Sequence, residues 1–115
     1  MEQLNRIELR GIVGTVRYQP FEDRAVCNFS LATSNVYKNR DGDPVIETQW
    51  HSVNAWEGKA MPDLSKIGKG TKLYVVGRLR SQKYVDNDGV ERTSYEVAAS
   101  QVTILDQQGQ LQYEM

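Results

Sequence analysis

The chain has 115 residues, 39% of them apolar and 25% charged, which is the size and composition of one modest globular domain. Its apolar runs are too short to span a membrane, and its N-terminal residues lack the pattern of a secretory signal, so the expected location is cytoplasmic. Cys27 and His51 are the only residues of their types, which excludes an internal disulfide and a Cys/His zinc site built within one chain.

The net charge of −1 is unevenly distributed along the chain. Residues 1–58 carry six basic and eight acidic side chains, residues 59–92 carry eight and four, and residues 93–115 carry none and three. The basic central segment could attract phosphates although the whole molecule is almost neutral. From charge alone, an ordinary mixed solvated surface remains an open alternative.

Five segments have the alternation, or the content of branched and aromatic residues, that is typical of strands: residues 4–16, 25–37, 45–56, 72–85 and 91–105. The first should bend at Gly11 and Gly14, as long strands do at barrel corners. Pro20 and its charged neighbours predict a loop over residues 17–25. Cys27 lies in an apolar run of the second strand, which predicts a buried, unreactive thiol.

The remaining connections are short. Residues 39–44, NRDGDP, predict a turn, because the later ligands of a calcium loop are missing. Residues 60–68 are the only expected helix, little more than two turns long, with Pro62 in its first turn and Gly68 as its cap. The sequence DNDG predicts a hairpin turn between the fourth and fifth strands.

This order of elements predicts an all-β fold, a five-stranded OB-fold barrel with one short helix between strands 3 and 4 and a long hairpin between strands 4 and 5. The domain would cover residues 1–105, and the glutamine-rich residues 106–115 would form a short, disordered C-terminal tail. Such barrels often bind oligonucleotides or oligosaccharides, but a fold does not by itself assign a function.

The third strand sets both tryptophans of the chain on one face. Alternation places Trp50 and Trp56 beside polar residues and turns Val53 and Ala55 to the other side. Rings on strands of small barrels more often belong to the core or to an interface. Here the opposite face already supplies small apolar side chains for a core, which favours exposed indoles.

The fourth strand adds cations to this picture. Arg78, Arg80 and Tyr84 have the same parity and would line one face of a regular strand. A row of cations and flat rings suits single-stranded nucleic acid. Cationic side chains can lie along the phosphates, and bases can stack on the rings, which contributes about 1–3 kcal/mol of binding free energy per base. No phosphate loop, nucleophile elbow or metal-ligand spacing is present, so we expect no enzyme activity, no cofactor and no metal.

Five blocks stand in order between about Gln3 and Leu105: LNRIELRGIVG, NFSLATSN, TQWHSV, GTKLYVVGRLR and YEVAA. Together they closely resemble the bacterial single-stranded DNA-binding protein family. The resemblance implies sequence-independent binding and protection of single-stranded DNA in replication, recombination and repair, in the nucleoid. Its base-stacking positions fall on Tyr37, Trp50, Trp56 and Tyr84. Tyrosine replaces the familiar tryptophan at the first and last of these, and Trp56 stands where phenylalanine is common.

Backbone neutralisation is expected from six basic residues: Arg78, Arg80, Lys83, Lys59, Lys69 and Lys72. Family members with one OB domain usually form homotetramers, with the histidine position near a subunit interface. The resemblance therefore implies a homo-oligomer, most simply a tetramer, with His51 at the interface, although the sequence leaves a dimer open.

Typical members end in a long tail whose acidic, apolar tip recruits replication and repair proteins, whereas this sequence ends in QLQYEM. This departure implies that recruitment is reduced or absent, that a different short signal replaces the tip, or that the chain is a trimmed or mobile-element version.

Two alternatives come from related binding modules. A primosome-type OB-fold protein-interaction module in replication restart would be expected to lose the aromatic track, and this sequence retains all four rings. An RNA-binding OB domain stays open, because stacking does not read the 2′-hydroxyl group.

Overall fold

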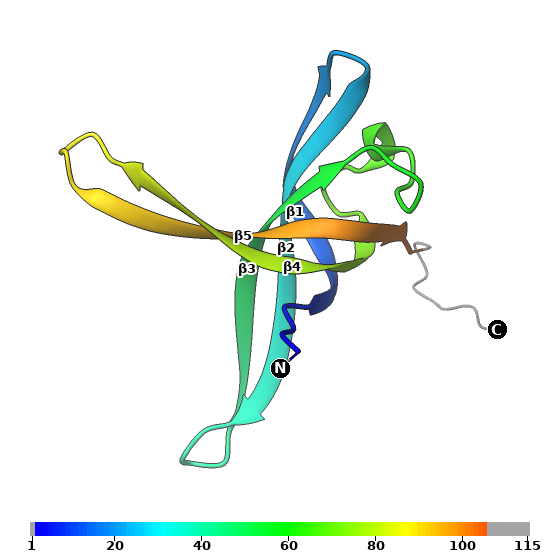
Figure 1. Cartoon of the computed structure of the whole chain (residues 1–115). Coiled ribbons are helices and arrows are strands. Elements are labelled where there is room, and N and C mark those ends of the chain that lie inside the picture. Colours follow the sequence, from blue (N-terminus) through cyan, green and yellow to red (C-terminus); the bar gives the residue numbers. More distant parts are fainter. Residues whose placement is uncertain (1, 106–115) are drawn as a thin grey trace.

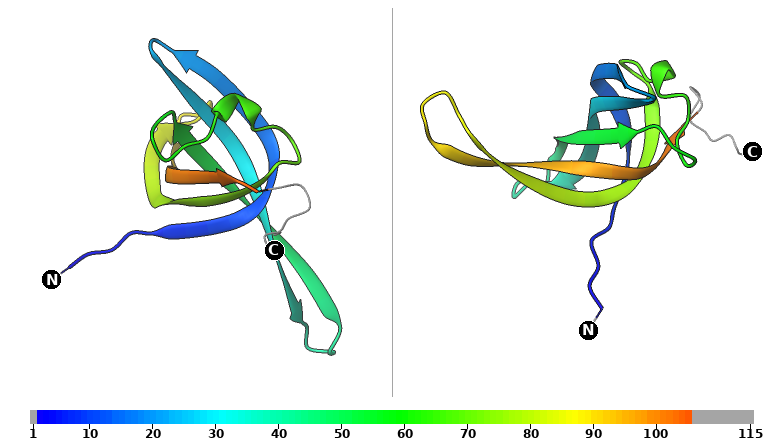
Figure 2. Two further views of the ribbon diagram at one scale, coloured as in Figure 1. Left: turned by 90° about the vertical axis from the view of Figure 1, so that its right-hand side faces the viewer. Right: turned by 45° about the horizontal axis from the view of Figure 1, so that its top comes forward.

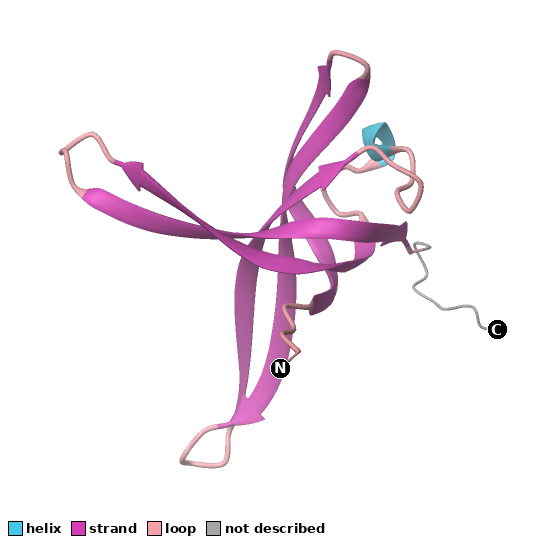
Figure 3. Ribbon diagram, viewed as in Figure 1, coloured by secondary structure: helices cyan, strands magenta, loops and turns pink. Residues whose placement is uncertain are grey.

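The computed structural model describes residues 2–105, which form five long strands and one turn of 3₁₀ helix (Figure 1, Figure 3). The elements are β1 (Ile7–Phe21), β2 (Arg24–Lys38), β3 (Pro44–Trp56), η1 (Leu64–Lys66), β4 (Lys72–Val85) and β5 (Glu91–Ile104). The strands close into a barrel in the order β1-β2-β3-β5-β4, which confirms the predicted all-β barrel. The tail predicted for residues 106–115 lies outside the described residues.

All neighbouring strands pair antiparallel except β3 and β5, which run parallel. The parallel contact consists of only two residue pairs, Val53 with Val97 and Asn54 with Ala98. This short contact closes the barrel between its two halves.

The barrel interior is filled by apolar side chains from all five strands and from the segment around η1. The buried cluster contains Val13, Cys27, Phe29, Leu31, Val53, Ala55, Leu64, Ile67, Leu73, Val75, Val97 and Val102. The predicted burial of Cys27 is confirmed, and this burial raises the pKa of its thiol. A thiol that resists ionisation is a poor nucleophile, as expected for a core residue.

The loop predicted for residues 17–25 is wrong, because β1 continues to Phe21 and β2 begins at Arg24. Only Glu22, which has a φ of 57°, and Asp23 form the turn between them. Pro20 lies opposite Ala25 of β2. Among the described residues, this part of β1 pairs only with β2, because the pairing of β1 with β4 covers residues 7–12. The missing N–H of Pro20 can therefore face an open strand edge, where it costs no ladder hydrogen bond.

The helix predicted for residues 60–68 shrinks to the single turn η1. The carboxylate of Asp63 caps it by accepting the backbone N–H of Ser65 at 3.1 Å. Side chains three residues apart align in 3₁₀ geometry, so Leu64 and Ile67 can both reach the core from so short an element. The sequence predicts a left-handed cap at Gly68, but the glycine with a left-handed backbone is Gly70, which has a φ of 89°. No helical element in residues 2–105 has the length and apolar character needed to cross a bilayer.

Three hairpins project from the barrel in different directions, as Figure 1 and the two turned views of Figure 2 show. They join β1 to β2, β2 to β3 and β4 to β5, and most of their residues beyond the barrel are exposed. The predicted turns are present at two tips, where Gly42 and Gly89 have φ values of 84° and 78°. The hairpins will be called the β1–β2, β2–β3 and β4–β5 arms.

Gly11 lies where the backbones of β1 and β2 approach closely. A Cβ atom there would lie 2.1 Å from the Ala32 carbonyl oxygen, which is part of the β2 backbone and cannot swing aside. We predict that Gly11→Ala lowers the free energy of unfolding by about 1–3 kcal/mol, measured by urea denaturation at fixed protein concentration.

Gly68→Ala is the matched control, because a Cβ atom there meets no heavy atom within 4 Å and the residue has no positive φ. Its effect should stay within about 0.5 kcal/mol. Equal losses in the two variants would contradict the steric explanation.

Candidate nucleic-acid interface

Alternation along β3 separates its indoles from the core. Val53 and Ala55 are buried, whereas Trp50 and Trp56 are 62% and 36% exposed. His51 points to the core side, where it is half-buried and its Nε2 shares a 2.8 Å hydrogen bond with Thr33 Oγ1. The third strand thus presents two large rings outside a complete core.

Trp50 occupies space that a glycine leaves free on β1. A Cβ atom on Gly14 would lie 2.5 Å from Cζ3 of the Trp50 indole. Gly14 lies in the interval between Val13 and Val16 where the register of β1 against β2 shifts. The indole therefore reaches across β2 and rests against the backbone of β1.

Trp56 is held by two residues of the β1–β2 arm. The guanidinium carbon of Arg24 lies 5.3 Å from the indole centroid, and Arg24 Nη2 donates to the Glu57 carbonyl at 3.0 Å. The Phe21 ring meets the indole edge-on, with centroids 5.9 Å apart and an interplanar angle of 78°. Such contacts each contribute about 0.5–1.5 kcal/mol and limit the positions that the indole can take.

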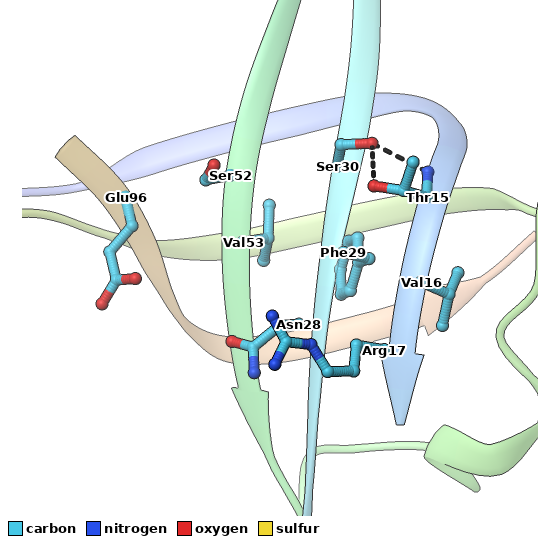
Figure 4. Close-up of a pocket in the computed structure, with 9 residues that line it drawn as sticks. All are labelled: Thr15, Val16, Arg17, Asn28, Phe29, Ser30, Ser52, Val53 and Glu96. Atoms are coloured by element: carbon cyan, nitrogen blue, oxygen red, sulfur yellow. Dashed lines mark hydrogen bonds between the residues drawn. The ribbon is translucent and has the colours of Figure 1, made fainter. Parts of the chain in front are cut away.

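Between the two tryptophans, the outer face of the sheet is polar and hollowed. The hollow has a volume of about 410 Å³ and is drawn in Figure 4. It is lined by Thr15, Val16, Arg17, Asn28, Phe29, Ser30, Ser52, Val53 and Glu96. One wall is fixed by Ser30 Oγ, which accepts the backbone N–H of Thr15 at 2.9 Å and lies 3.0 Å from the Thr15 hydroxyl.

In the barrel, β4 lies beyond β5 from β3, and two of its arginines are on the same outer face. Arg78 pairs with Ala98, and Ala98 pairs with Asn54, so these residues form one row across the sheet. Arg80 also faces outward, but its Nε donates to the Glu96 carboxylate at 3.0 Å. A phosphate bound by Arg80 would have to compete with this carboxylate, whereas Arg78 has no ion-pair partner within residues 2–105.

The other two predicted stacking residues lie on separate arms. Tyr37 pairs with Val45, five positions from the Trp50 row, so alternation turns it to the opposite face of the β2–β3 arm. Tyr84 is on the β4–β5 arm, where it pairs with Arg92. Arg92 in turn lowers the pKa of Asp86 through a hydrogen bond to its carboxylate. Both tyrosines are about half exposed.

The predicted lysine contacts are scattered. Lys83 lies on the face of β4 opposite to Arg78 and Tyr84, and Lys72 pairs with Ile12 at the start of that strand. Lys59 and Lys69 are exposed in the connection between β3 and β4. Across residues 2–105, no group of three or more His, Cys, Asp or Glu side chains could hold a metal ion.

Sequence reasoning missed four exposed residues: Arg17, Phe21 and Arg24 on this outer face, and Tyr95 on the β4–β5 arm. The first three lie in the segment expected to be a loop. Arg17 and Phe21 share parity along a continued strand, which is the sequence pattern that places them on one face, but Pro20 predicts that the strand ends before it. Tyr95 is as exposed as Trp50 and lies opposite Ser81 in the β4–β5 arm.

Two curated relatives are similar to most of the chain. The single-stranded DNA-binding protein of Neisseria meningitidis serogroup A is 39% identical over 105 residues, which cover 89% of this chain and 60% of the relative. The protein of the same name from Xanthomonas axonopodis pv. citri is 37% identical over 87 residues, covering 75% of this chain and 48% of its own length. The chain thus spans between about half and three fifths of these relatives.

A solved structure is similar in fold as well. The Plasmodium falciparum SSB in complex with ssDNA has a TM-score of 0.75 and 25% identity, and the match covers 92% of this chain and 98% of that one. The model of the single-strand binding protein family matches residues 4–105, which is almost the whole barrel with its arms. The chain belongs to the single-strand binding protein family.

Proposed function

We propose that this protein binds and protects single-stranded DNA, with little sequence preference, in replication, recombination and repair within the cytoplasm. The observation that carries the proposal is the outer face of β3, where two indoles stay exposed although the barrel core is complete. The relatives named single-stranded DNA-binding proteins and the similar structure solved with ssDNA support the same function.

Binding would combine stacking with charge neutralisation. Bases stack on Trp50 and Trp56 and continue onto Tyr37 and Tyr84 where the strand reaches the β2–β3 and β4–β5 arms. Phosphates are neutralised chiefly by Arg78, with Arg80 and the predicted lysines Lys59, Lys69, Lys72 and Lys83 contributing along the path. Neither interaction reads base identity strongly, and neither requires a catalytic group, a metal or a cofactor.

The first test is tryptophan fluorescence during titration with an oligothymidine, at low and high salt. We expect strong quenching by the single strand, weaker binding as salt rises because counterions are released, and no quenching by a duplex of equal length.

Trp50→Ala should cost about 1–3 kcal/mol of binding free energy, while Trp50→Phe, which keeps a ring, should cost less. Unchanged emission would mean that the indoles do not contact DNA, and an RNA strand of equal length tests the choice of sugar.

Gly14→Ala tests whether the position of Trp50 matters for stacking. The added methyl group must displace the Trp50 indole, because it would lie 2.5 Å from Cζ3. We expect the affinity for oligothymidine to fall about fivefold or more, by analogy with the loss of one stacked base. In a Trp50→Ala background the same glycine substitution should change affinity little. An equal loss in both backgrounds would contradict the mechanism.

We also propose a homotetramer, with His51 near a subunit interface, on the grounds of the family and of the inward position of this half-buried side chain. Light scattering should then give four times the chain mass of 13.1 kDa. His51→Ala should shift the assembly toward smaller species on dilution, whereas Ser52→Ala, on the outer face, should not. A monomer in the wild type, or equal behaviour of the two variants, would refute the proposal.

A further inference from the structure

Arg17 stands at one end of the hollow between the tryptophans. It is exposed, it lines the hollow, and its direct cross-strand partner is Asn28 (Figure 4). Arg80 is engaged by Glu96 and Arg24 by the Glu57 carbonyl, and Arg78, which has no ion-pair partner within residues 2–105, does not line the hollow. In the described part of the chain, Arg17 makes no ion pair or hydrogen bond, so its guanidinium is available to a ligand.

The side-chain amide of Asn28, opposite Arg17 on β2, is a second donor, and Asn54 on β3 orients it. Asn54 Nδ2 donates to Asn28 Oδ1 at 2.8 Å, which occupies the acceptor end of the Asn28 amide. The Nδ2 group of Asn28 is left without a partner among residues 2–105. An amide held in this way presents N–H donors to the hollow that Asn28 lines.

Hydroxyl groups complete the polar surroundings. Ser52 lines the hollow from β3, and Thr15 and Ser30 line it from β1 and β2. The single carboxylate on its rim, Glu96, is paired with Arg80, which offsets its charge. The hollow therefore offers a free cation, an oriented amide donor and the hydroxyl group of Ser52, a set that matches the oxygens of a phosphate.

We propose that this hollow binds a phosphodiester group of single-stranded DNA, with Arg17 and Asn28 as direct contacts and Asn54 as the residue that positions Asn28. This inference rests on the proposed function and adds a backbone contact between the two stacking rings. The site would hold the strand where it passes from Trp50 to Trp56, and it would contribute equally for every base.

The first experiment compares Arg17→Gln with Arg10→Gln. Both remove one positive charge from β1, but Arg10 lies against Tyr74 in the part of the strand that pairs with β4. Affinities for oligo-dT and oligo-dC are measured from about 50 to 300 mM salt. Arg17→Gln should weaken both oligonucleotides by the same factor and reduce the salt slope by about 0.7, the value for one phosphate contact on a single strand. Arg10→Gln should leave the slope unchanged.

Three results would overturn the inference: an unchanged slope for Arg17→Gln, an equal fall in both variants, or a loss confined to one base. The proposed function is judged separately, because it fails only if the wild-type protein does not bind single strands.

The second experiment uses Asn28 itself. In Asn28→Asp, one carboxylate oxygen can still accept from Asn54 while the other faces the phosphate, so binding should weaken more than in Asn28→Ala, and rising salt should narrow the difference. Asn54→Ala should weaken binding less than either substitution, because it only frees the Asn28 amide to turn. Urea denaturation of each variant separates folding from binding. Tighter binding by Asn28→Asp than by Asn28→Ala would show that the group bound there donates a hydrogen bond or carries positive charge, and would refute a phosphate.

Discussion

The two-residue parallel contact between β3 and β5 is the constraint on which the rest of the surface depends. Directly paired residues lie on the same face of a sheet, so the pairing of Val53 with Val97 commits both to the interior. The neighbouring pair, Asn54 with Ala98, is then committed to the outside. Through this pair, one row of outward-facing residues runs across the sheet from Asn28 on β2 to Arg78 on β4.

Because this pairing fixes which face of the sheet is the interior, the two indoles lie on the outer face and take no space from the buried apolar cluster. The interior is filled with branched and small side chains, and the indoles stand on the outer face, each supported differently. Trp50 rests where Gly14 has no side chain, and Trp56 is held by Phe21 and Arg24. Leaving a large apolar side chain exposed forgoes stabilisation on the order of 2 kcal/mol, which base stacking would restore in the proposed complex.

Much of this arrangement could be read from the sequence, for identifiable reasons. Period-2 alternation in β3 marked Val53 as interior and Trp50 as exterior, and the glycine-containing turns marked two of the three hairpins. The loop expected after residue 16 was wrong because Pro20 is a breaker only where its N–H is needed. Whether a strand edge is paired depends on the fold and not on local sequence. For that reason the local sequence does not place Arg17, Phe21 and Arg24 on the outer face.

Tertiary contacts hidden from the sequence also explain the other differences. Parity showed that Arg78 and Arg80 share a face, but not that Glu96 on the adjacent strand already engages Arg80. The predicted helix is a single turn, η1, from which Leu64 and Ile67 both reach the core, a tertiary contact that the local sequence does not show. The family resemblance groups Tyr37 with the other rings, whereas strand alternation turns it to the far face of its arm.

The three diverging arms have a mechanical consequence. The molecule is 49 Å in its longest dimension, and the rings that it displays are distributed over arms that point in different directions. Duplex DNA has a persistence length of about 50 nm, so it is almost straight on this scale and can touch only part of such a surface. A single strand bends freely enough to follow it. In the proposed function, shape would therefore act as a filter for flexibility, distinguishing one strand from two without reading any base.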